Sequence, residues 1–354
     1  MARNVCFVTG TRAEYGLMRT TLAAIEEHPD LTLQVLATGM HLDHSRGHSL
    51  DLISQVDHVT PWPTDGVTAR NTGTALADMA DAFGRMATEI VLVVGDRVEA
   101  FAGASAAAIG GRIVAHVHGG DRALGQLDDA LRHAITKLAH VHFAATPISG
   151  ERIAKLGEDA DRIHVVGAPG IDGIVAAAID PGVDGPFGLL VYHPGSADDV
   201  NEAGVMRQLI DDALATIPTV VAVYPNNDPG AGGIAEVLDA ERQPGLVKFR
   251  DLPRERYLGL LRDTRWLLGN SSSGIIEAAS FGTPVIDVGP RQAGRECGGN
   301  VKRVTVAEVP QTLANTRPWT GTNPYGGDGT GQRIAERLTQ LPADPAWRRK
   351  LITY

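Results

Sequence analysis

Charged and hydroxyl side chains follow several apolar runs of this sequence, at points where a strand would end. The first group lies in VTGTRAEYG, residues 8–16, where Gly10 permits a sharp turn before Arg12 and Glu14. The amides after Thr11 open a predicted helix, and the N-terminus of a helix favours an anion. We interpret this stretch as a substrate- or phosphate-binding turn, with an ordinary strand-to-helix turn and an exposed arginine as the alternative.

A second group follows the apolar run Ile90–Val94 and consists of Asp96, Arg97 and Glu99. Charges grouped at the carboxyl end of a strand indicate either a site or the start of a helix. Asp96 is a candidate acid/base residue, with Arg97 and Glu99 in support. The alternative is that Asp96 only caps the next helix.

A third group begins with two histidines in AHVHGGD, residues 115–121. His116 and His118 are two residues apart, so we expect them to share one face of a strand. A metal pair is conceivable, but no further Cys or His with metal-ligand spacing follows, and we predict no metal.

Carboxylates continue this third group around a glycine-rich turn and the start of a helix. They are Asp121, Asp128 and Asp129, and Arg132 and His133 follow one turn later. One interpretation is capping acids on a solvated helix face. The other is an acid/base group, in which Asp121, Asp128 and His118 join Asp96 and are supported by Arg132 and His133.

The second half of the chain carries hydroxyls and amides. His193, in YHPGS, follows an apolar run and is either a phosphate donor or a loop histidine. In GNSSSGIIEAASFGTPVIDVG, residues 269–289, hydroxyls and free amides at a helix start predict an anion nest. Its expected members are Ser271, Ser272, Ser273 and Gly274, with Glu277 about one and a half turns further on, placed to accept from a ribose.

Two arginines stand among glycines in the following loop, GPRQAGRE, residues 289–296. We expect Arg291 and Arg295 to lie beside the serine nest, with Arg291 as the better candidate for contacting a diphosphate. A surface ion-pair loop is the alternative. Neither this region nor the serine nest matches a Walker loop or a dinucleotide-binding GxGxxG motif.

The elements that must position these groups alternate between short apolar runs and helical stretches, which is typical of parallel sheets covered by helices on both faces. The Pro-, Gly- and Asp-rich segment Ala176–Phe187 interrupts the rhythm and is predicted to be a linker. We therefore predict an α/β protein of two doubly wound, Rossmann-like domains, residues 1–180 and 181–354, whose last helix can pack back on the first domain. Ligands of such sheets bind at the carboxyl ends of the strands, here in a cleft between the domains.

The expected strands and helices have the following bounds. In the first domain the strands are Asn4–Val8, Leu31–Ala37, Ile90–Val94, Arg112–His118, His140–Ala145 and Arg162–Val166, and the helices include Leu76–Met86, Val98–Ile109 and Asp129–Ala139. In the second they are strands Gly188–Tyr192, Thr219–Tyr224, Leu246–Phe249, Trp266–Leu268 and Pro284–Val288, and helices Asp199–Ala215, Ile234–Glu241, Arg254–Arg262, Ser271–Ser280 and Ile334–Leu341.

Composition narrows the class of protein. The 354 residues are 43% hydrophobic, which is enough for more than one core. The net charge of −10 disfavours nucleic acid or an anionic membrane as the main partner. Two distant cysteines fit a reducing cytoplasm, and no apolar stretch approaches the roughly 18 residues of a membrane span.

Together these motifs resemble the hydrolysing UDP-N-acetylglucosamine 2-epimerases of the sialic-acid-pathway branch. The resemblance spans most of the chain, in the family's order, and rests on GTRAEYG, GDRVEA, HVHGGD, DDALRHAITKLAH, the His-Pro pair, NSSSGIIEAASFGTPVIDVG and RQAGRE. It implies the glycosyltransferase-B architecture, a homo-oligomer (dimer or tetramer), and neither a metal nor an added cofactor.

The resemblance also implies the reaction and the roles of matched residues. An acid/base pair would promote loss of UDP across C1–C2 to give a 2-acetamidoglucal, and water would then add with inversion at C2 to yield N-acetylmannosamine. Ser271, Ser272 and Gly274 match positions that meet the diphosphate, Glu277 matches the ribose-binding acid, and Arg12 and His193 match residues near the phosphates. Asp96, Asp121 and Asp128 are the carboxylates available for proton transfer, and which is base and which is acid stays open.

The sequence departs from the human-type branch in one motif. That branch is expected to read His-Ile-Glu-Gly-Gly-Glu, whereas this chain reads His-Val-His-Gly-Gly-Asp, so that His118 and Asp121 each replace a glutamate. The departure concerns the sugar side and leaves the nucleotide side intact. Alternatives are the same reaction on a GDP-linked or 2,4-diacetamido sugar, a glycosyltransferase of the same fold, and a non-catalytic sugar-nucleotide sensor.

Overall fold

The computed structural model describes residues 2–43, 49–63, 68–122, 127–226, 228–250 and 252–353. The chain divides into two compact units. The first comprises Met1–Asp172 together with Tyr325–Tyr354, and the second comprises Gly173–Pro324.

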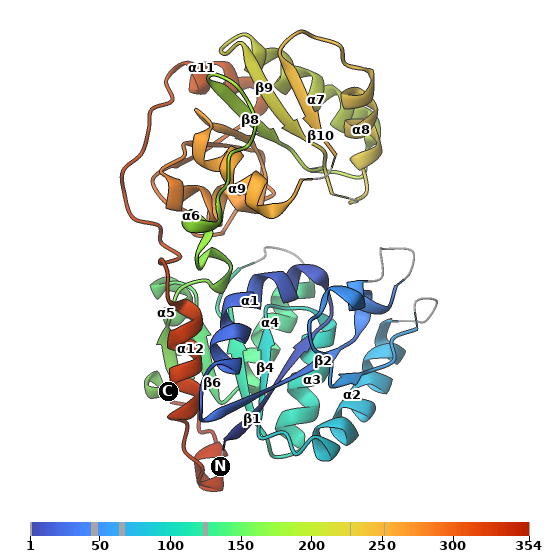
Figure 1. Ribbon diagram of the computed structural model, residues 1–354, viewed down its shortest axis with the longest axis vertical. Helices are drawn as coiled ribbons and strands as arrows, with labels where there is room; N and C mark the ends of the chain where they lie inside the picture. Colours follow the sequence, from blue (N-terminus) through green and yellow to red (C-terminus); the bar gives the residue numbers. More distant parts are fainter. Residues whose placement is uncertain are drawn as a thin grey trace. The chain divides into compact units, whose positions relative to one another are not determined.

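The first unit is built on a parallel sheet with the strand order β3-β2-β1-β4-β5-β6-β7 (Figure 1). Residue Arg3 of β1 pairs with Leu31 of β2, and Val5 pairs with Ile90 of β4. The strands are β1 (Arg3–Thr9), β2 (Leu31–Ala37), β3 (His58–Val59), β4 (Ile90–Val94), β5 (Ile113–Val117), β6 (Val141–Ala144) and β7 (Ile163–Val165). The helices are α1 (Arg12–Glu26), α2 (Thr68–Arg85), α3 (Val98–Ile109), α4 (Leu127–Leu138), α5 (Pro147–Lys155) and α12 (Thr330–Thr339).

Alternation along the strands sends side chains into two cores, one on each face of this sheet. Along β1, Val5 and Phe7 join a core covered by α1 and α12, whereas Cys6 and Val8 join a core covered by α2, α3 and α4. Because both faces are buried, the central strands read as continuous apolar runs, which is why the sequence located them well.

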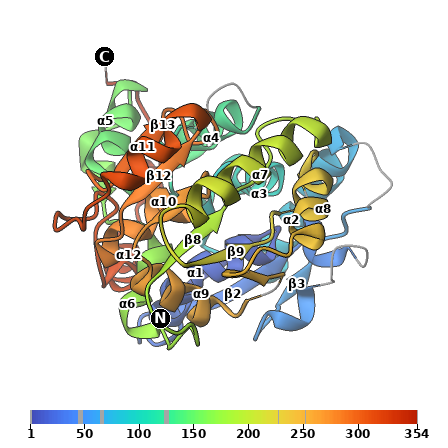
Figure 2. The same cartoon turned by 90° about the horizontal axis from the view of Figure 1, so that it is seen from above.

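The second unit repeats this plan with the parallel order β10-β9-β8-β11-β12-β13 (Figure 2). One face packs against α7, α8 and α11, and the other packs against α9. Its strands are β8 (Phe187–Val191), β9 (Thr219–Val223), β10 (Leu246–Phe249), β11 (Leu267–Gly269), β12 (Val285–Val288) and β13 (Val301–Val304). Its helices are α6 (Ile174–Ala177), α7 (Asp199–Leu214), α8 (Ala231–Ala240), α9 (Arg254–Asp263), α10 (Ser272–Ile276) and α11 (Val309–Ala314).

Residues Tyr325–Tyr354 lie in the first unit, in line with the expectation that the last helix can pack back on the first domain. The carboxylate of Asp172, the last residue before the second unit, caps α12 by accepting from the amides of Thr330 (2.9 Å) and Gly331 (2.6 Å). Gly331 also lets α12 approach α1 closely, because a Cβ there would lie 2.7 Å from the carbonyl oxygen of Thr20. The boundary between the units therefore lies at Asp172/Gly173 and not at the predicted 180/181, and α12 packs against α1 (Figure 1).

The predicted linker Ala176–Phe187 is packed structure of the second unit. The amide of Ile179 donates to Glu255 O (3.1 Å), and Arg256 Nε donates to Pro181 O (2.8 Å), so this segment runs along α9. Phe187 is 2% exposed and begins β8. The Pro and Gly content of Ala176–Phe187 reflects an irregular backbone that hydrogen bonds hold in place. Composition alone does not distinguish such a segment from a linker.

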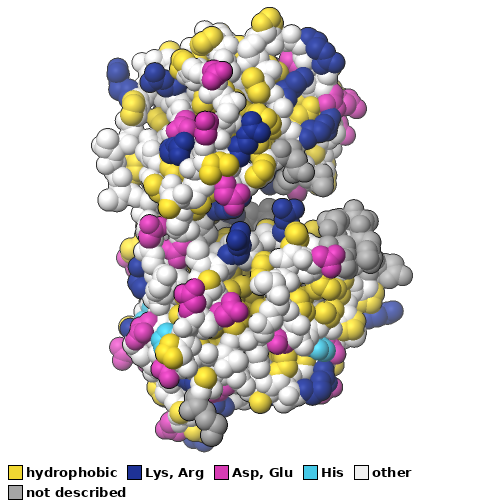
Figure 3. All heavy atoms as spheres, viewed as in Figure 1, with side chains coloured by type: hydrophobic (Ala, Val, Ile, Leu, Met, Phe, Trp, Pro, Cys, Tyr) yellow, Lys and Arg dark blue, Asp and Glu magenta, His cyan; other side chains and the backbone are white. Residues whose placement is uncertain are grey.

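Strand order reverses between β1 and β4 in the first unit and between β8 and β11 in the second. Ligands of doubly wound sheets bind at the carboxyl edge near such a switch point. Within the described part of the chain, no helix is both long and apolar enough to cross a membrane. On the face in Figure 3, acidic and basic side chains are interspersed over both units.

Candidate functional site

The switch point of the first unit carries a reciprocal cap formed by Thr11 and Glu14. Thr11 caps α1 by accepting from the amide of Glu14 (3.2 Å), and Glu14 Oε2 accepts from the amide of Gly10 (2.8 Å). Desolvation raises the pKa of Glu14 to about 7, against the lowering effect of Arg97 and the Gly10 amide. Arg12, in the same first turn, is exposed.

Glu99 is buried beside this cap and explains two of the glycines there. Arg97 binds it through one edge of its guanidinium, with Nε to Oε2 at 3.1 Å and a terminal nitrogen to Oε1 at 2.8 Å. A Cβ at Gly10 would lie 2.9 Å from the Glu99 carboxyl carbon, and one at Gly39 would lie 2.4 Å from its oxygen. The Arg97–Glu99 pair therefore fills the space between the turns that follow β1, β2 and β4.

His41 is a buried member of this region that the sequence reasoning missed. Its Nε2 lies 3.0 Å from Thr9 Oγ1, and its Nδ1 lies 2.8 Å from Ser49 Oγ. Burial lowers the pKa of His41 and keeps the ring neutral. The sequence did offer a signal, because His41 lies in TGMH, directly after a predicted strand. Arg12 was selected for the same kind of position.

Asp96 and Arg132 form a partly buried ion pair that joins the turn after β4 to helix α4. Arg132 is 6% exposed and contacts Asp96 Oδ2 with one guanidinium nitrogen. Its other terminal nitrogen donates to the backbone carbonyl of His118 (2.8 Å). One guanidinium therefore connects the ends of β4 and β5, and Asp96 is more than a helix cap.

His118 follows β5 and pairs with Asp121. Its Nδ1 lies 2.9 Å from Asp121 Oδ2, and Ser149 Oγ donates to the other carboxylate oxygen (2.7 Å). Nε2 of His118 is buried, and within the described part of the chain it has no hydrogen-bond partner. The arrangement resembles the orientation of a catalytic imidazole by a carboxylate.

The expectation that His116 and His118 share one strand face is wrong. β5 ends at Val117, and His118 has a φ of +62°, a left-handed conformation that turns its side chain out of the strand pattern. His116 points into the unit instead, where its Nε2 lies 2.8 Å from Gly95 O. Burial lowers the pKa of His116 to about 3.

Asp128 and Asp129 occupy the first turn of α4, as expected. Asp128 is exposed. Burial would lower the pKa of Arg97, but Glu99 and, to smaller extents, Glu14 and Asp128 raise it, which places the Asp128 charge within reach of the first switch point. His133 Nε2 lies 3.7 Å from Asp129 Oδ2, one helical turn away.

At the switch point of the second unit, the side-chain amide of Asn270 binds the backbone of His193 twice. The amide of His193 donates to Asn270 Oδ1 (2.7 Å), and Asn270 Nδ2 donates to His193 O (2.8 Å). His193 Nδ1 accepts from the amide of Asn226 (3.1 Å). Burial, with a smaller contribution from Arg291, lowers the pKa of His193 to about 4, so its ring is neutral at physiological pH.

The serine cluster predicted after β11 is present. Ser271 is the N-cap of α10, and its Oγ lies 2.9 Å from Ser273 Oγ, which in turn contacts the hydroxyl of Tyr257 at 2.5 Å. Only glycine fits at 269, where φ is +138° and a Cβ would lie 2.0 Å from Val191 O. This close approach places the serine turn directly beside the end of β8.

Glu277 and Arg291 are both engaged in ion pairs. Glu277 is 9% exposed and binds Arg254 at 2.6 Å, and burial raises its pKa despite that partner. Arg291 binds Asp228 (2.8 Å) and donates to Pro194 O (3.0 Å), next to His193. The loop meets the serine turn through Gln292, missed from sequence, whose Nε2 donates to Asn270 O (2.8 Å).

The structure thus gathers the predicted residues into two groups, one per unit. The group of the first unit comprises residues that follow strands or begin helices, together with Arg132 inside α4: Arg12, Glu14, Asp96, Arg97, Glu99, His118, Asp121, Asp128 and Arg132. The group of the second unit comprises residues after its strands and on or beside α10: His193, Ser271, Ser272, Ser273, Gly274, Glu277 and Arg291. Among the described residues, no group of three or more His, Cys, Asp or Glu is arranged to hold a metal ion.

Comparison with known proteins decides the family. Residues 23–339 match the family described as UDP-N-acetylglucosamine 2-epimerase. A UDP-N,N'-diacetylbacillosamine 2-epimerase (hydrolyzing) of Legionella pneumophila is 36% identical, over 97% of this chain and 97% of its own length. This chain belongs to the UDP-N-acetylglucosamine 2-epimerase family.

Further relatives agree with this membership. A UDP-N-acetylglucosamine 2-epimerase of Neisseria meningitidis is 32% identical over 85% of this chain and 83% of its own length. A crystal structure of a UDP-GlcNAc 2-epimerase from Neisseria meningitidis, bound to UDP-GlcNAc, superposes with a TM-score of 0.81 at 18% identity and covers 96% of this chain and 100% of that one. The predicted family and the predicted fold, two parallel-sheet α/β domains of the glycosyltransferase-B type, are confirmed.

Proposed function

We propose that this epimerase-family member is a hydrolysing 2-epimerase that converts UDP-N-acetylglucosamine to N-acetylmannosamine and UDP. In the first step a base removes the C2 proton while the C1–O bond breaks and its electron pair leaves with UDP, which gives a 2-acetamidoglucal. In the second step water adds across that double bond, with its oxygen at C1 and a proton at C2 on the opposite face. Atoms and charges balance without a redox cofactor.

The observation that carries this proposal is that Arg132 connects the carboxylate of Asp96 to the backbone of His118. Its guanidinium binds Asp96 and also the backbone of His118, which is itself paired with Asp121. Two acid/base groups held in one network suit a reaction that removes a proton in one step and returns one in the next. Asp128 is a third candidate, and the assignment of base and acid among these groups stays open.

Within the His118–Asp121 pair, the geometry favours the imidazole as the group that exchanges a proton with substrate. Both carboxylate oxygens of Asp121 have partners, His118 and Ser149, whereas His118 Nε2 has no partner within the described ranges. The replacement of the human-type glutamate by His118 then preserves a titratable group at this position.

The second unit would hold the nucleotide. Ser271, Ser272, Ser273 and Gly274 offer hydroxyls and amides to a diphosphate, and Glu277 offers a carboxylate to the ribose hydroxyls. His193 is neutral, so it would act as a hydrogen-bond donor to phosphate through Nε2 while Nδ1 accepts from Asn226. Arg291 would supply positive charge to the departing diphosphate.

A UDP-linked 2,4-diacetamido sugar is the second candidate substrate. The relative at 36% identity bears the name of a UDP-N,N'-diacetylbacillosamine 2-epimerase, whereas the relative at 32% bears that of a UDP-N-acetylglucosamine 2-epimerase. Both reactions would use the same acid/base groups and differ in what surrounds C4 of the sugar.

The test is to incubate the protein with each UDP-sugar in D₂O and to follow UDP and the free sugar by proton NMR. Release of UDP with deuterium at C2 of an inverted free sugar is the expected result, and the sugar that reacts faster is the substrate. An inverted sugar that remains UDP-linked would contradict hydrolysis. Dependence of UDP release on an added acceptor would indicate a glycosyltransferase instead.

A further inference from the structure

Helix α4 connects the candidate site to the opposite edge of the first sheet. Its first turn carries Asp128, its second carries Arg132, and it ends at Leu138. Twelve residues of α-helix span about 18 Å, so the end of α4 lies far from the chemistry that its start serves. Whatever holds the carboxyl end of this helix also influences the position of Arg132.

The last residues of the chain dock at that far edge, across the amino ends of β5, β6 and β7. Trp347 O accepts from Arg162 (2.6 Å), whose guanidinium stacks over the Trp347 ring at 4.3 Å. Arg348 donates to Gly111 O, and the amide of Thr353 donates to Gly157 O (3.3 Å). This C-terminal segment, Trp347–Thr353, is therefore bound to the first unit by stacking and hydrogen bonds.

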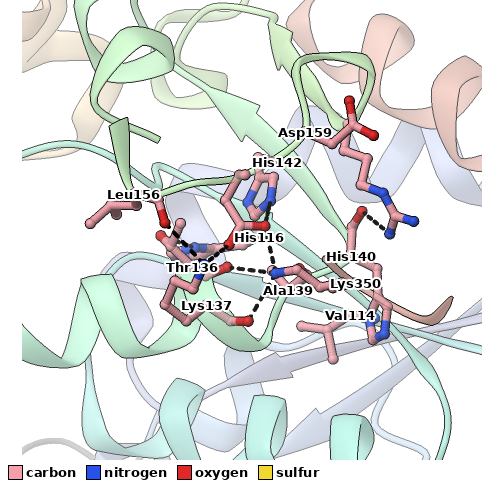
Figure 4. A network of polar contacts seen from close by, with 12 residues as sticks. Val114, His116, Thr136, Lys137, Ala139, His140, His142, Leu156, Asp159 and Lys350 are labelled. Carbon is pink, nitrogen blue, oxygen red and sulfur yellow. Dashed lines mark hydrogen bonds and ion pairs between the residues drawn. The ribbon is translucent and has the colours of Figure 1, made fainter. Parts of the chain in front are cut away.

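Lys350 caps the carboxyl end of α4 from within this segment (Figure 4). Its Nζ donates to Ala139 O (2.5 Å) and Lys137 O (2.8 Å) and binds Glu158 Oε2 (2.6 Å). The final carbonyls of a helix have no partner within it, and an ammonium has three donors, so each donor meets an acceptor here. A residue more than 200 positions away in sequence thus completes this helix end.

Glu158 is the buried centre of this contact. Its side chain is 0% exposed and also binds Lys137 Nζ (2.7 Å) and His142 Nε2 (3.1 Å). Burial would raise the pKa of Glu158, but hydrogen bonds from His142, Lys137 and Lys350 outweigh it and hold the pKa at about 2. The carboxylate is therefore charged at physiological pH, although no step of the proposed reaction uses it.

Contacts within hydrogen-bond distance continue from here to the candidate site, where the single hydroxyl proton of Thr136 serves one of its two acceptors at a time. Thr136, on α4, places its Oγ1 3.0 Å from Arg132 O and 3.2 Å from His116 Nδ1. His116 is neutral, and because a carbonyl only accepts, its Nε2 carries the proton that binds Gly95 O. Gly95 directly precedes Asp96. Helix α4 therefore contacts Asp96 itself through Arg132, and it contacts the turn that holds Asp96 through Thr136 and His116.

We propose that Lys350 and Glu158 are positioning residues for the reaction, which rests on the function proposed above. The C-terminal segment anchors the carboxyl end of α4. It thereby fixes the position of α4 along its axis and its rotation about that axis, and so the position from which Arg132 binds Asp96. A displacement of about 1 Å at a catalytic group can slow an enzyme greatly, so loss of the anchor should reduce kcat more than it weakens substrate binding.

The test compares Lys350→Met with Arg349→Met, a neighbouring exposed residue, in the full-length protein. We expect Lys350→Met to lower kcat on the order of tenfold with KM and the Kd of UDP unchanged within about twofold. Amide hydrogen exchange should quicken from Asp128 to Arg132 as well as near Ala139. Arg349→Met should leave all of these unchanged, and Lys350→Arg should recover most of the rate because arginine also donates to carbonyls.

Several results would overturn the proposal. They are an unchanged kcat in folded Lys350→Met, a loss confined to KM, or faster exchange only at the carboxyl end of α4. If Lys350→Met does not fold, Lys350→Met/Glu158→Gln removes both charges and keeps one acceptor oxygen, for either Lys137 or His142. The same kcat loss and exchange pattern are expected. If the wild-type protein turns over no nucleotide sugar, the proposed function fails, and exchange at Asp128–Arg132 still decides whether Lys350 anchors this helix.

Discussion

The carboxyl edges of the two sheets share a topology but differ in the chemistry of their side chains. In the first unit each ionic pair at the switch point and beside it has one deeply buried member, namely Glu99 (2% exposed along its side chain), Arg132 (7%) or His118 (9%). In the second, the switch point itself is made of amide, hydroxyl and neutral imidazole groups. Its nearby ion pairs use arginines whose side chains are 31% and 48% exposed, Arg291 and Arg254.

The difference indicates a division of labour. Paired, desolvated carboxylates and histidines hold and release protons, and their pKa values respond strongly to their surroundings. Amides, hydroxyls and a histidine with a pKa of about 4 keep the same protonation state across the physiological range, which suits the binding of a diphosphate. Substitutions in the first unit should therefore affect kcat, and substitutions in the second should affect KM.

The largest effect is expected for Asp96→Asn. Asparagine keeps an acceptor for Arg132 but removes the charge and the proton-transfer group, so kcat should fall about 10³-fold. Binding of UDP, measured by isothermal titration calorimetry, should stay within about twofold. A kcat near the wild-type value would exclude Asp96 from proton transfer, and Asp30→Asn, an exposed position in the same unit, serves as the control.

A smaller effect of the opposite kind is expected for Glu277→Gln. This change removes the charge that would accept from the ribose hydroxyls, and KM should rise about tenfold because a charge-assisted hydrogen bond is worth about 1.5–3 kcal/mol. The kcat value should change little. Steady-state kinetics that showed a fall in kcat with an unchanged KM would break the proposed division between the units.

Ser149→Ala tests the His118–Asp121 pair in the first unit. Loss of the 2.7 Å bond to Asp121 loosens the carboxylate that orients His118, and kcat should fall about fivefold, as for one hydrogen bond of about 1 kcal/mol. The pH profile of kcat should shift as well, because the partner of the imidazole changes. The exposed neighbour Ile148, changed to alanine, should leave both the rate and the profile as they are.

The smallest effect concerns the pH dependence of stability. The pKa of Glu14 is raised from 4.5 to about 7, so between these values the folded chain retains a proton that the unfolded chain releases, and this group makes the free energy of unfolding fall as the pH rises. His193 acts in the opposite direction, because its lowered pKa makes stability rise with pH between about 4 and 6.5.

Glu14→Gln should therefore flatten the decline in stability toward pH 7, as measured by urea unfolding at a series of pH values. Glutamine keeps an acceptor for the Gly10 amide. Glu26→Gln, at an exposed position of the same helix, is the control. An unchanged slope in Glu14→Gln would show that this carboxyl group is not desolvated in solution.

Much of the fold follows from local patterns. β2, β4, β10 and α3 have the bounds that the sequence predicts, because long apolar runs and alanine-rich stretches between glycines leave few alternatives. The edge strands β3 and β13 escaped detection, since two or four half-exposed residues carry little hydrophobic signal. The segment Ala176–Phe187 was misjudged, because its fixed contacts with α9 leave no mark on composition.

The residue types of the candidate site were also predictable, but not their partners. Asp96 and Ser271 were selected because charges and hydroxyls after apolar strands indicate a site, and Arg132 because it lies one helical turn after Asp128 and Asp129. His118 leaves the strand because its backbone is left-handed, and Asp121 binds Ser149, which lies 28 residues away on another helix. Both features depend on the tertiary structure. Gln292 was passed over because a single polar residue does not stand out from its sequence neighbours, whereas the signal for His41, its place after a predicted strand, was not used.

The sequence by itself determined the two doubly wound sheets and the kinds of groups at their edges, since strand periodicity, glycine turns and helix starts are local properties of the chain. Only the tertiary structure decided which of these groups face one another. In the structure, residues Tyr325–Tyr354 belong to the first unit, where Asp172 caps α12 and Lys350 caps α4. Both contacts join residues far apart in sequence, and their free energy depends on burial and geometry that no local pattern encodes.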